Sequence, residues 1–274
     1  MHVLVTGGLG FLGRAVGREL LATGHRVTVM TRGRGDRNPP PGVELVTGDI
    51  RDRARVAEIV QECGYDGVVH LAALTSGRDS FADPLGYFDV NATGTLNLLM
   101  PWRLHGRPRH RPRWSSPPPT SSTVRSTTAH CPKTSTHTPR AQYAASKVAA
   151  EHMVAAYAAT GAIGAVTVRP FNIAGAVDGV TDTDPAGIIP NVFRAITGQL
   201  DHVTLNGDGS AVRDFVHVTD VATGIRLALA PCTPGASQTI NLGSGVGTSM
   251  ATVVATRRAG HRPSGCRSPA VAQA

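Results

Sequence analysis

The sequence is poor in the residues that form disulfide frameworks, metal clusters and membrane spans. Its four cysteines, in a chain of 274 residues, show no C-x-x-C spacing and have no clustered histidines beside them. This supports neither a zinc site nor a disulfide framework, and we expect reduced, incidental thiols. No apolar run approaches the length needed to cross a bilayer, and the chain begins with a strand-like run instead of a signal peptide. We therefore expect a cytoplasmic protein with no membrane partner.

Acidic residues are missing from two blocks of the chain, residues 101–140 and 256–274. These blocks hold eight and four basic residues, whereas the rest of the chain has 15 basic and 19 acidic residues. The net charge of +8 therefore comes from two blocks and not from a basic surface spread over the protein. Aromatic residues, which would stack on bases, are confined there to Trp102 and Trp114. We expect no nucleic-acid partner.

A glycine-rich motif follows the first apolar run. Residues 3–5 predict a short strand, Gly7-x-x-Gly10-x-x-Gly13 a tight turn, and residues 15–22 an amphipathic helix. A pyrophosphate can bind the amides of a helix N-terminus only where no side chain blocks the approach to the backbone, and glycines meet this need. The motif therefore indicates a phosphate-binding turn, while an ordinary turn is the alternative for such a pattern alone.

A second motif combines a tyrosine and a lysine. In Tyr143-Ala-Ala-Ser-Lys147 the two residues are four apart, so on a helix they share one face and the ammonium can reach the phenol. Taken alone, such a pair is an ordinary surface pair. Behind a phosphate-binding turn, it indicates a catalytic pair.

Together the motifs resemble those of the extended short-chain dehydrogenase/reductase family, in particular its NAD(P)-dependent nucleotide-sugar epimerases and dehydratases. They occur in the family's order and at its spacing, over roughly residues 1–100 and 141–255. The matching segments are Thr6-Gly7-Gly8-Leu9-Gly10-Phe11-Leu12-Gly13, Gly48-Asp49-Ile50, His70-Leu71-Ala72-Ala73, Asn91-Ala-Thr-Gly94-Thr95-Leu-Asn97, Tyr143-Ala-Ala-Ser-Lys147, Arg169-Pro170-Phe171-Asn172-Ile-Ala-Gly175, Gly207-Asp208-Gly209, Arg213-Asp214-Phe215-Val216-His217-Val218 and Asn241-Leu242-Gly243-Ser244-Gly245.

The resemblance implies an α/β fold with two parts. Residues 1–168 would form a Rossmann-like, doubly wound parallel sheet that binds the cofactor. Residues 169–274 would form a small, C-terminally incomplete substrate lobe that also contributes back to the core. Within this lobe, Ile188-Ile189-Pro190 is expected to begin a helix.

By the same resemblance, the cofactor-binding residues come from several places in the first part. The glycine turn would hold the phosphates, Asp49 and Ile50 would flank the adenine, and small residues after the fourth strand would let the cofactor lie close. Asn91 would lie near Lys147 and the cofactor, although an Asn that opens a helix is also a plain N-cap. The predicted cofactor-binding residues are Gly7, Gly10, Phe11, Leu12, Gly13, Arg32, Asp49, Ile50, Leu71, Ala72, Ala73, Asn91, Tyr143 and Lys147.

The choice between NAD and NADP depends on the end of the second strand. Members that prefer NAD carry an acid there, which binds the ribose hydroxyls. This chain has Thr31-Arg32 instead, and Arg32 could meet a 2′-phosphate through a bidentate contact. The position therefore favours NADP slightly over NAD, with a solvated surface arginine as the alternative.

The resemblance also assigns the chemistry. Tyr143 would be the acid/base, because a phenol with a pKa near 10 works at neutral pH only if a cation such as Lys147 stabilises the phenolate. Asn172 and Arg213 would bind the diphosphate of a nucleotide-sugar substrate, with Asp214 as a structural partner of the arginine.

The implied function is that of an NAD(P)-dependent epimerase or dehydratase acting on a nucleotide-diphosphate sugar through a transient keto intermediate. A keto-reductase of the same family acting on another small substrate, and a cofactor-binding pseudoenzyme, stay open as alternatives. A homodimer is also left open.

Residues 101–140 depart from the family pattern. A doubly wound fold needs a helix and a buried strand there, but the stretch contains eight prolines and eight cations, and we expect nothing in it to pair as a central strand. The resemblance implies a substrate-binding Ser or Thr about 25 residues before the catalytic tyrosine, where this chain has Pro118. We hypothesise two frame disturbances, one compensated before Tyr143 and one that alters residues 256–274. The alternative is a lineage-specific Pro/Arg loop and tail.

The frame hypothesis predicts that the protein made from the sequence as given is poorly stable and has little epimerase or dehydratase activity. Residues 101–140 should be largely irregular, because they bury too little surface to offset the entropy of ordering them. Limited proteolysis should therefore cut first in this stretch. Restoring the alternative frame should rescue folding, whereas a stable, active enzyme with residues 101–140 protected would refute the hypothesis.

Overall fold

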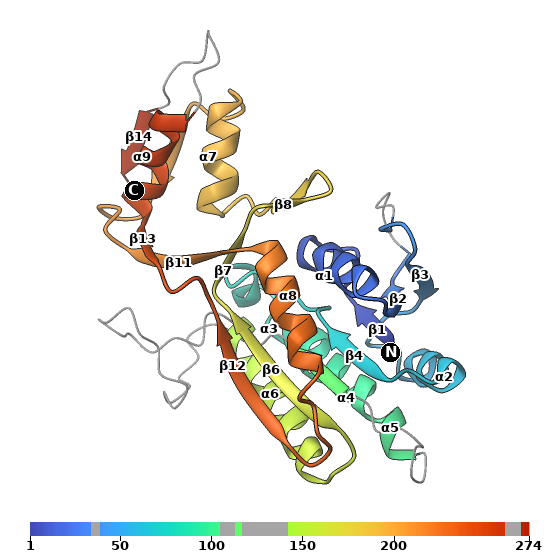
Figure 1. The fold of residues 1–274 in the computed structure, drawn as a ribbon. Helices are drawn as coiled ribbons and strands as arrows, with labels where there is room; N and C mark the ends of the chain where they lie inside the picture. Colours follow the sequence, from blue (N-terminus) through green and yellow to red (C-terminus); the bar gives the residue numbers. More distant parts are fainter. Residues whose placement is uncertain (34–38, 105–112, 117–141, 261–269, 274) are drawn as a thin grey trace. The chain divides into compact units, whose positions relative to one another are not determined.

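A parallel sheet of seven strands organises the larger of two compact units. The structure is a computed structural model, and it describes residues 1–33, 39–104, 113–116, 142–260 and 270–273 (Figure 1).

The chain divides into two compact units. The first unit comprises residues 1–170 and 219–242, and the second comprises residues 171–218 and 243–274. The chain therefore leaves the first unit, returns to it with one helix and one strand, and leaves it again.

The strands of the first unit pair in parallel in the order β12, β6, β5, β4, β1, β2, β3. This confirms the predicted doubly wound α/β fold. The strand order reverses between β1 and β4, where ligands bind in such sheets, beyond the carboxyl ends of the strands. The strands are β1 (His2–Thr6), β2 (Arg26–Thr31), β3 (Glu44–Thr47), β4 (Gly67–His70), β5 (Arg113–Ser116), β6 (Gly164–Pro170) and β12 (Ser237–Leu242).

Helices cover both faces of this sheet. Helix α4 packs against both α2 and α6 on one face. On the other face, Glu19 of α1 and Arg226 of α8 form an ion pair of 2.7 Å. The helical segments are α1 (Phe11–Ala22), α2 (Arg53–Cys63), a 3-10 turn η1 (Asp79–Phe81), α3 (Pro84–Phe88), a π-helical turn η2 (Asp89–Thr93), α4 (Gly94–Leu99), α5 (Pro101–Leu104), α6 (Gln142–Ala159) and α8 (Val218–Leu229).

Local sequence signals begin and end these helices. The Asp52 side chain caps α2 by accepting a hydrogen bond of 3.0 Å from the Arg55 amide, and Gly64 ends the helix with a φ of 58°. Asp83 caps α3 in the same way through the Gly86 amide at 2.9 Å, with Pro84 at the first helical position. The core between sheet and helices is apolar, and it includes Leu4, Leu98 and Trp114.

Strand β5 contradicts the prediction that nothing in residues 101–140 pairs as a central strand. Arg113–Ser116 pairs with β4 on one side and with β6 on the other, and α5 also lies in this stretch. The physical reason is that four residues free of proline lie between two strands that both need a partner, and Trp114 supplies apolar surface that is completely buried. The rest of the stretch, including Pro118, lies outside the described residues.

Two polar atoms of β5 are nevertheless buried without hydrogen bonds. Neither the Trp114 indole nitrogen nor the Ser115 hydroxyl has a partner within the part of the chain that the structure describes. Each such atom costs about 1–3 kcal/mol, because it has lost water and gained nothing. A central parallel strand ordinarily carries Val, Ile or Leu at such positions, so these residues fit their place poorly.

The second unit contains small sheets and two helices. Strands β7 (Asn172–Ala174), β11 (Val212–His217) and β13 (Gly247–Ser249) form a three-stranded sheet. Strands β8 (Ala176–Val177) and β9 (Val180–Thr181) form a hairpin, and β10 (His202–Leu205) pairs with β14 (Ala270–Gln273). Helices α7 (Ile188–Ile196) and α9 (Met250–Gly260) pack together, and α7 confirms the helix predicted to begin at Ile188.

The tail that the sequence marked as anomalous is partly regular. Helix α9 continues to Gly260, and β14 pairs in parallel with β10, while residues 261–269 lie outside the described residues. None of the described helices combines the length and the apolar character that a membrane crossing requires.

The unpaired hydroxyl of Ser115 leads to a stability prediction. Ser115→Ala should raise the free energy of unfolding by about 1 kcal/mol, because it removes a buried polar group that has no partner. Ser146→Ala is the matched control, since the Ser146 hydroxyl is buried and hydrogen-bonded, and this variant should lose about 1–3 kcal/mol. Urea unfolding followed by circular dichroism measures both. Equal losses in the two variants would show that the Ser115 hydroxyl is bonded in solution.

Candidate functional site

The turn between β1 and α1 brings two segments of backbone into close contact. Gly7 has a φ of 70°, and a Cβ atom there would lie 2.7 Å from the Ala72 amide nitrogen, so only glycine fits. A Cβ atom on Gly13 would lie 2.3 Å from the Gly7 carbonyl oxygen, so α1 rests directly on the turn. The predicted residues Leu71 and Ala72, which follow β4, therefore lie against the glycine turn.

Gly10 differs from these two glycines. Its backbone is extended, with a φ of −75°, and a Cβ atom there would meet only the Gly7 oxygen, at 3.2 Å. No side chain caps α1, and its first turn contains no acidic residue. The amides of Phe11, Leu12 and Gly13 at this helix start are therefore available to an anion.

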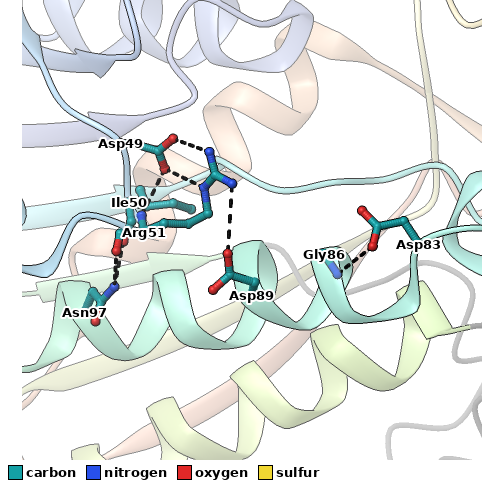
Figure 2. Close-up of polar contacts among 7 residues, drawn as sticks. All are labelled: Asp49, Ile50, Arg51, Asp83, Gly86, Asp89 and Asn97. Atoms are coloured by element: carbon teal, nitrogen blue, oxygen red, sulfur yellow. Dashed lines mark hydrogen bonds and ion pairs between the residues drawn. The ribbon is translucent and has the colours of Figure 1, made fainter.

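A charged cluster fixes the loop after β3 (Figure 2). The Arg51 guanidinium donates to both carboxylate oxygens of Asp49, at 2.7 and 3.1 Å, and lies 3.9 Å from Asp89. These hydrogen bonds lower the pKa of Asp49, and the charge of Arg32 acts in the same direction. Asp49 is therefore a carboxylate at neutral pH, and Arg32 is close enough to influence it.

Ile50 is held in this loop from two sides. The Asn97 side chain donates to the carbonyl oxygens of Ile50 and Arg51, at 3.0 and 3.1 Å. A Cβ atom on Gly94 would lie 2.6 Å from the Ile50 side chain, so the absence of a side chain there leaves room for Ile50. The two residues predicted to flank the adenine thus occupy a defined position beside α4.

A buried histidine connects the two central strands. Thr6 and His70 are register partners at the ends of β1 and β4, and the Thr6 hydroxyl lies 2.7 Å from His70 Nδ1. His70 Nε2 lies 3.0 Å from the Thr95 hydroxyl, which itself donates to the Asn91 carbonyl at 2.6 Å. Because the Thr95 proton is used for Asn91, His70 Nε2 must be the donor to Thr95, and Nδ1 accepts from Thr6. His70 is therefore neutral, and burial lowers its pKa to about 3.

Asn91 extends this network to α6. Its side chain accepts from the Leu74 amide at 2.9 Å and donates to the Leu74 carbonyl at 3.0 Å and to the Ser146 hydroxyl at 2.9 Å. Ser146 in turn donates to the Tyr143 carbonyl at 2.8 Å. Asn91 lies within the π-helical turn η2 and not at the start of a helix, so the N-cap alternative is wrong.

Tyr143 and Lys147 are both buried on α6, with 8% and 6% exposure. Burial raises the pKa of Tyr143 to about 12, with a further increase from the nearby Tyr87. Burial lowers the pKa of Lys147 to about 8, and the charge of Glu151 partly offsets this. At pH 7 the phenol is neutral and the amine is mostly protonated, and the surface-pair alternative is wrong because both side chains lie inside the protein.

The residues predicted to bind substrate lie in the second unit. Asn172 begins β7, and its side chain donates to the Asp214 carbonyl at 3.0 Å. Arg213 lies on β11 and is exposed. Asp214 does not serve as the arginine's partner as predicted. Its carboxylate accepts hydrogen bonds from Ser244 and Gly245 and holds that loop.

Sequence reasoning gave no role to several residues that build this site. His70, Thr95 and Ser146 form the buried network, and Arg51 and Asn97 fix the loop that contains Asp49 and Ile50. The signal for three of them was present, since His70, Thr95 and Ser146 lie inside motifs in which roles were assigned only to Leu71 to Ala73, to Asn91 and to Tyr143 and Lys147. Within the described residues, no group of His, Cys, Asp and Glu could hold a metal ion.

The sheet order, the glycine turn and the uncapped helix behind it define the Rossmann-like class of α/β proteins. Residues 3–243 match the model of the NAD dependent epimerase/dehydratase family, and the chain belongs to that family. The resemblance read from the sequence motifs is confirmed.

Three individual proteins show how similar the relatives are. A UDP-glucose 4-epimerase of Corynebacterium glutamicum is 34% identical over 266 residues, which cover 93% of this chain and 78% of the relative. The crystal structure of a UDP-glucose 4-epimerase from Brucella ovis in complex with NAD matches with a TM-score of 0.85 and 32% identity, covering 99% and 85% of the two chains. A UDP-glucose 4-epimerase from Stenotrophomonas maltophila with bound NAD and formylated UDP-arabinopyranose has a TM-score of 0.83 and 31% identity, covering 100% and 86%.

These two solved relatives hold NAD, and nothing among the comparisons supports the slight preference for NADP read from Arg32.

The contrast between two glycines predicts separable effects on folding and binding. Gly10→Ala should lower the thermal unfolding temperature only slightly, because the extended backbone there suits any residue and the Gly7 oxygen, 3.2 Å from the added methyl group, has to move by only a few tenths of an ångström. It should weaken dinucleotide binding at least about tenfold, because the added methyl group blocks the approach to the helix amides. Calorimetric titration with NAD measures this. Gly13→Ala is the contrast and should destabilise the fold itself, and unchanged NAD binding in Gly10→Ala would exclude this turn as the phosphate site.

Proposed function

We propose that this chain is an NAD-dependent epimerase of a UDP-sugar, with Tyr143 and Lys147 as its catalytic pair. The observation that carries this proposal is the burial of both residues on one helix that Asn91 ties to the loop after β4. The similarity to UDP-glucose 4-epimerases over most of the chain supports the reaction and the nucleotide.

The residues present fit a dinucleotide. Gly7 and Gly13 are required by the backbone, whereas a Cβ atom on Gly10 would meet only the Gly7 oxygen, at a close 3.2 Å, and the absence of a side chain there suits the approach of a pyrophosphate. The uncapped start of α1 supplies amides for the phosphates, and Asp49 supplies an acceptor beside Ile50 for an adenine amino group. When bound, NAD supplies a hydride acceptor and donor and a positive nicotinamide ring.

Tyr143 takes the proton from a sugar hydroxyl and later returns it. With a pKa of about 12, its phenol ionises too rarely at neutral pH to act as a base without help from a cation. Lys147, which is mostly protonated at pH 7, provides that cation from the same face of α6. Asn91 and Ser146 hold the backbone of this helix start and thereby orient both side chains.

Asn172 and Arg213 bind the UDP-sugar in this proposal. The Arg213 guanidinium is exposed and carries the charge that a diphosphate needs. The Asn172 amide nitrogen donates a hydrogen bond to the Asp214 carbonyl, which fixes the orientation of the side chain. Its amide oxygen can then accept a hydrogen bond from the substrate.

A second candidate function is a nucleotide-sugar-binding protein without turnover. The sequence observation that favours it is the run Pro117–Pro119, where the resemblance implies a hydroxyl residue that contacts the substrate. Binding of UDP-glucose together with NAD, but no conversion to UDP-galactose, would identify this function.

We also propose that the chain forms a homodimer. Large apolar side chains are exposed in the first unit on η1 and α3, where Phe81 and Leu85 are 65% and 80% exposed. A second copy of the chain would remove them from water. Analytical ultracentrifugation should give twice the mass of the chain, and a monomer at micromolar concentration would exclude this part.

Tyr143→Phe tests the catalytic assignment, because it removes only the hydroxyl. Cofactor binding should be retained, and the conversion of UDP-glucose to UDP-galactose should fall by about three orders of magnitude or more. The measurement is a coupled assay of UDP-galactose formation, with NAD binding followed in parallel. Tyr87→Phe is the matched control, since Tyr87 packs edge-on against Tyr143 with 6.4 Å between ring centroids and should keep most of the activity. Near-normal turnover in Tyr143→Phe would contradict the assignment of Tyr143 as the acid/base.

A further inference from the structure

A mostly buried acid lies one helical turn after Lys147 on α6. Glu151 and Arg169 form an ion pair of 2.7 Å, and their side chains are only 11% and 14% exposed. The Thr239 hydroxyl donates to the same Glu151 oxygen at 3.1 Å. The catalytic function proposed above does not use this cluster.

The cluster joins three elements of the first unit. Glu151 lies on α6, Arg169 at the end of β6, and Thr239 on β12, which pairs with β6. Asn241 of β12 is the register partner of Arg169, and Thr239 lies two residues before Asn241. The two partners of Glu151 therefore come from neighbouring strands. The carboxylate therefore fixes the rotation and the height of α6 on this part of the sheet.

Glu151 also acts on Lys147 electrostatically. Residues four apart on a helix are about 6 Å apart on one face. A negative charge at that distance stabilises the protonated amine, and it opposes the effect of burial on the pKa of Lys147. The neighbouring groups His70 of β4 and Tyr143 of α6 do not supply such a charge, since burial keeps both neutral at pH 7.

We propose that Glu151 is a positioning residue of the site: clamped between Arg169 and Thr239, it fixes α6 on the sheet and places a negative charge one turn from the Lys147 ammonium. The proposal deepens the proposed function, on which the role of Lys147 rests. Arg169 limits the effect, because its positive charge lies against the same carboxylate.

The small number of lysines in the chain makes the protonation of Lys147 measurable. The chain contains two lysines, Lys133 and Lys147. In a Lys133→Arg background, lysine labelled with carbon-13 at the ε position gives a single NMR signal, whose shift reports the protonation of Lys147. The titration uses the full chain without cofactor or substrate, so it is independent of whether the protein has epimerase activity.

Glu151→Gln keeps the shape of the side chain and removes its charge. The Lys147 midpoint, about 8 before the change, should fall by roughly one pH unit. Arg169→Gln should move it in the opposite direction, because the carboxylate is then uncompensated. Glu19→Gln is the matched control: it breaks an ion pair of the same 2.7 Å length between α1 and α8 and should leave the midpoint unchanged.

An unchanged midpoint in a folded Glu151→Gln protein would overturn the proposal, as would an equal shift in Glu19→Gln. If Glu151→Gln does not fold, Arg169→Gln decides: an upward shift supports the proposal and no shift overturns it. A shift in the expected direction in a protein that binds no NAD and epimerises no UDP-sugar would support the positioning role while the proposed function fails.

Discussion

The buried hydrogen bonds through His70 are the constraint on which the site depends. They connect β1, β4, the π-helical turn and α6, and each donor must find its acceptor inside the protein because water has no access. Only one pattern of protons satisfies them, with His70 neutral. A shift of either strand would leave a buried polar group unpaired, at a cost of about 1–3 kcal/mol. Helix α6, which carries the proposed catalytic pair, is therefore held in a fixed position.

Burial shifts the pKa values of Tyr143 and Lys147 in opposite directions. It raises the pKa of Tyr143 to about 12 and lowers the pKa of Lys147 to about 8, so that both side chains are driven toward their neutral forms. A proton shuttle needs the reverse, an ionised phenol beside a charged amine. We propose that Glu151 favours the ammonium form of Lys147, and that this cation, together with the positive nicotinamide ring of bound NAD, favours the phenolate of Tyr143.

Strand β5 shows where sequence patterns stop being informative. Residues 113–116 have neither an alternating nor a continuous apolar pattern, and they lie among prolines and arginines. They form a strand because β4 and β6 leave a gap of one strand between them, and pairing across it satisfies backbone groups on both sides. The backbone groups that need these partners belong to β4 and β6, which are far away in the sequence. The Trp114 nitrogen and the Ser115 hydroxyl have no partner among the described residues, which shows that the segment fills the gap without being well suited to it.

The sequence by itself determined the family, the doubly wound fold, the residues of the glycine turn and the helix that carries the proposed catalytic pair. These features depend on local backbone geometry, which neighbouring residues determine. Examples are the turn that needs Gly7 and Gly13 and the helix with Tyr143 and Lys147 on one face. The tertiary structure alone decided the burial of that pair, the neutral state of His70, the partners of Asn91 and Asp214, and the clamp on Glu151. Each of these depends on which distant segments share an interior, where water is excluded and every charge and hydrogen bond needs a partner.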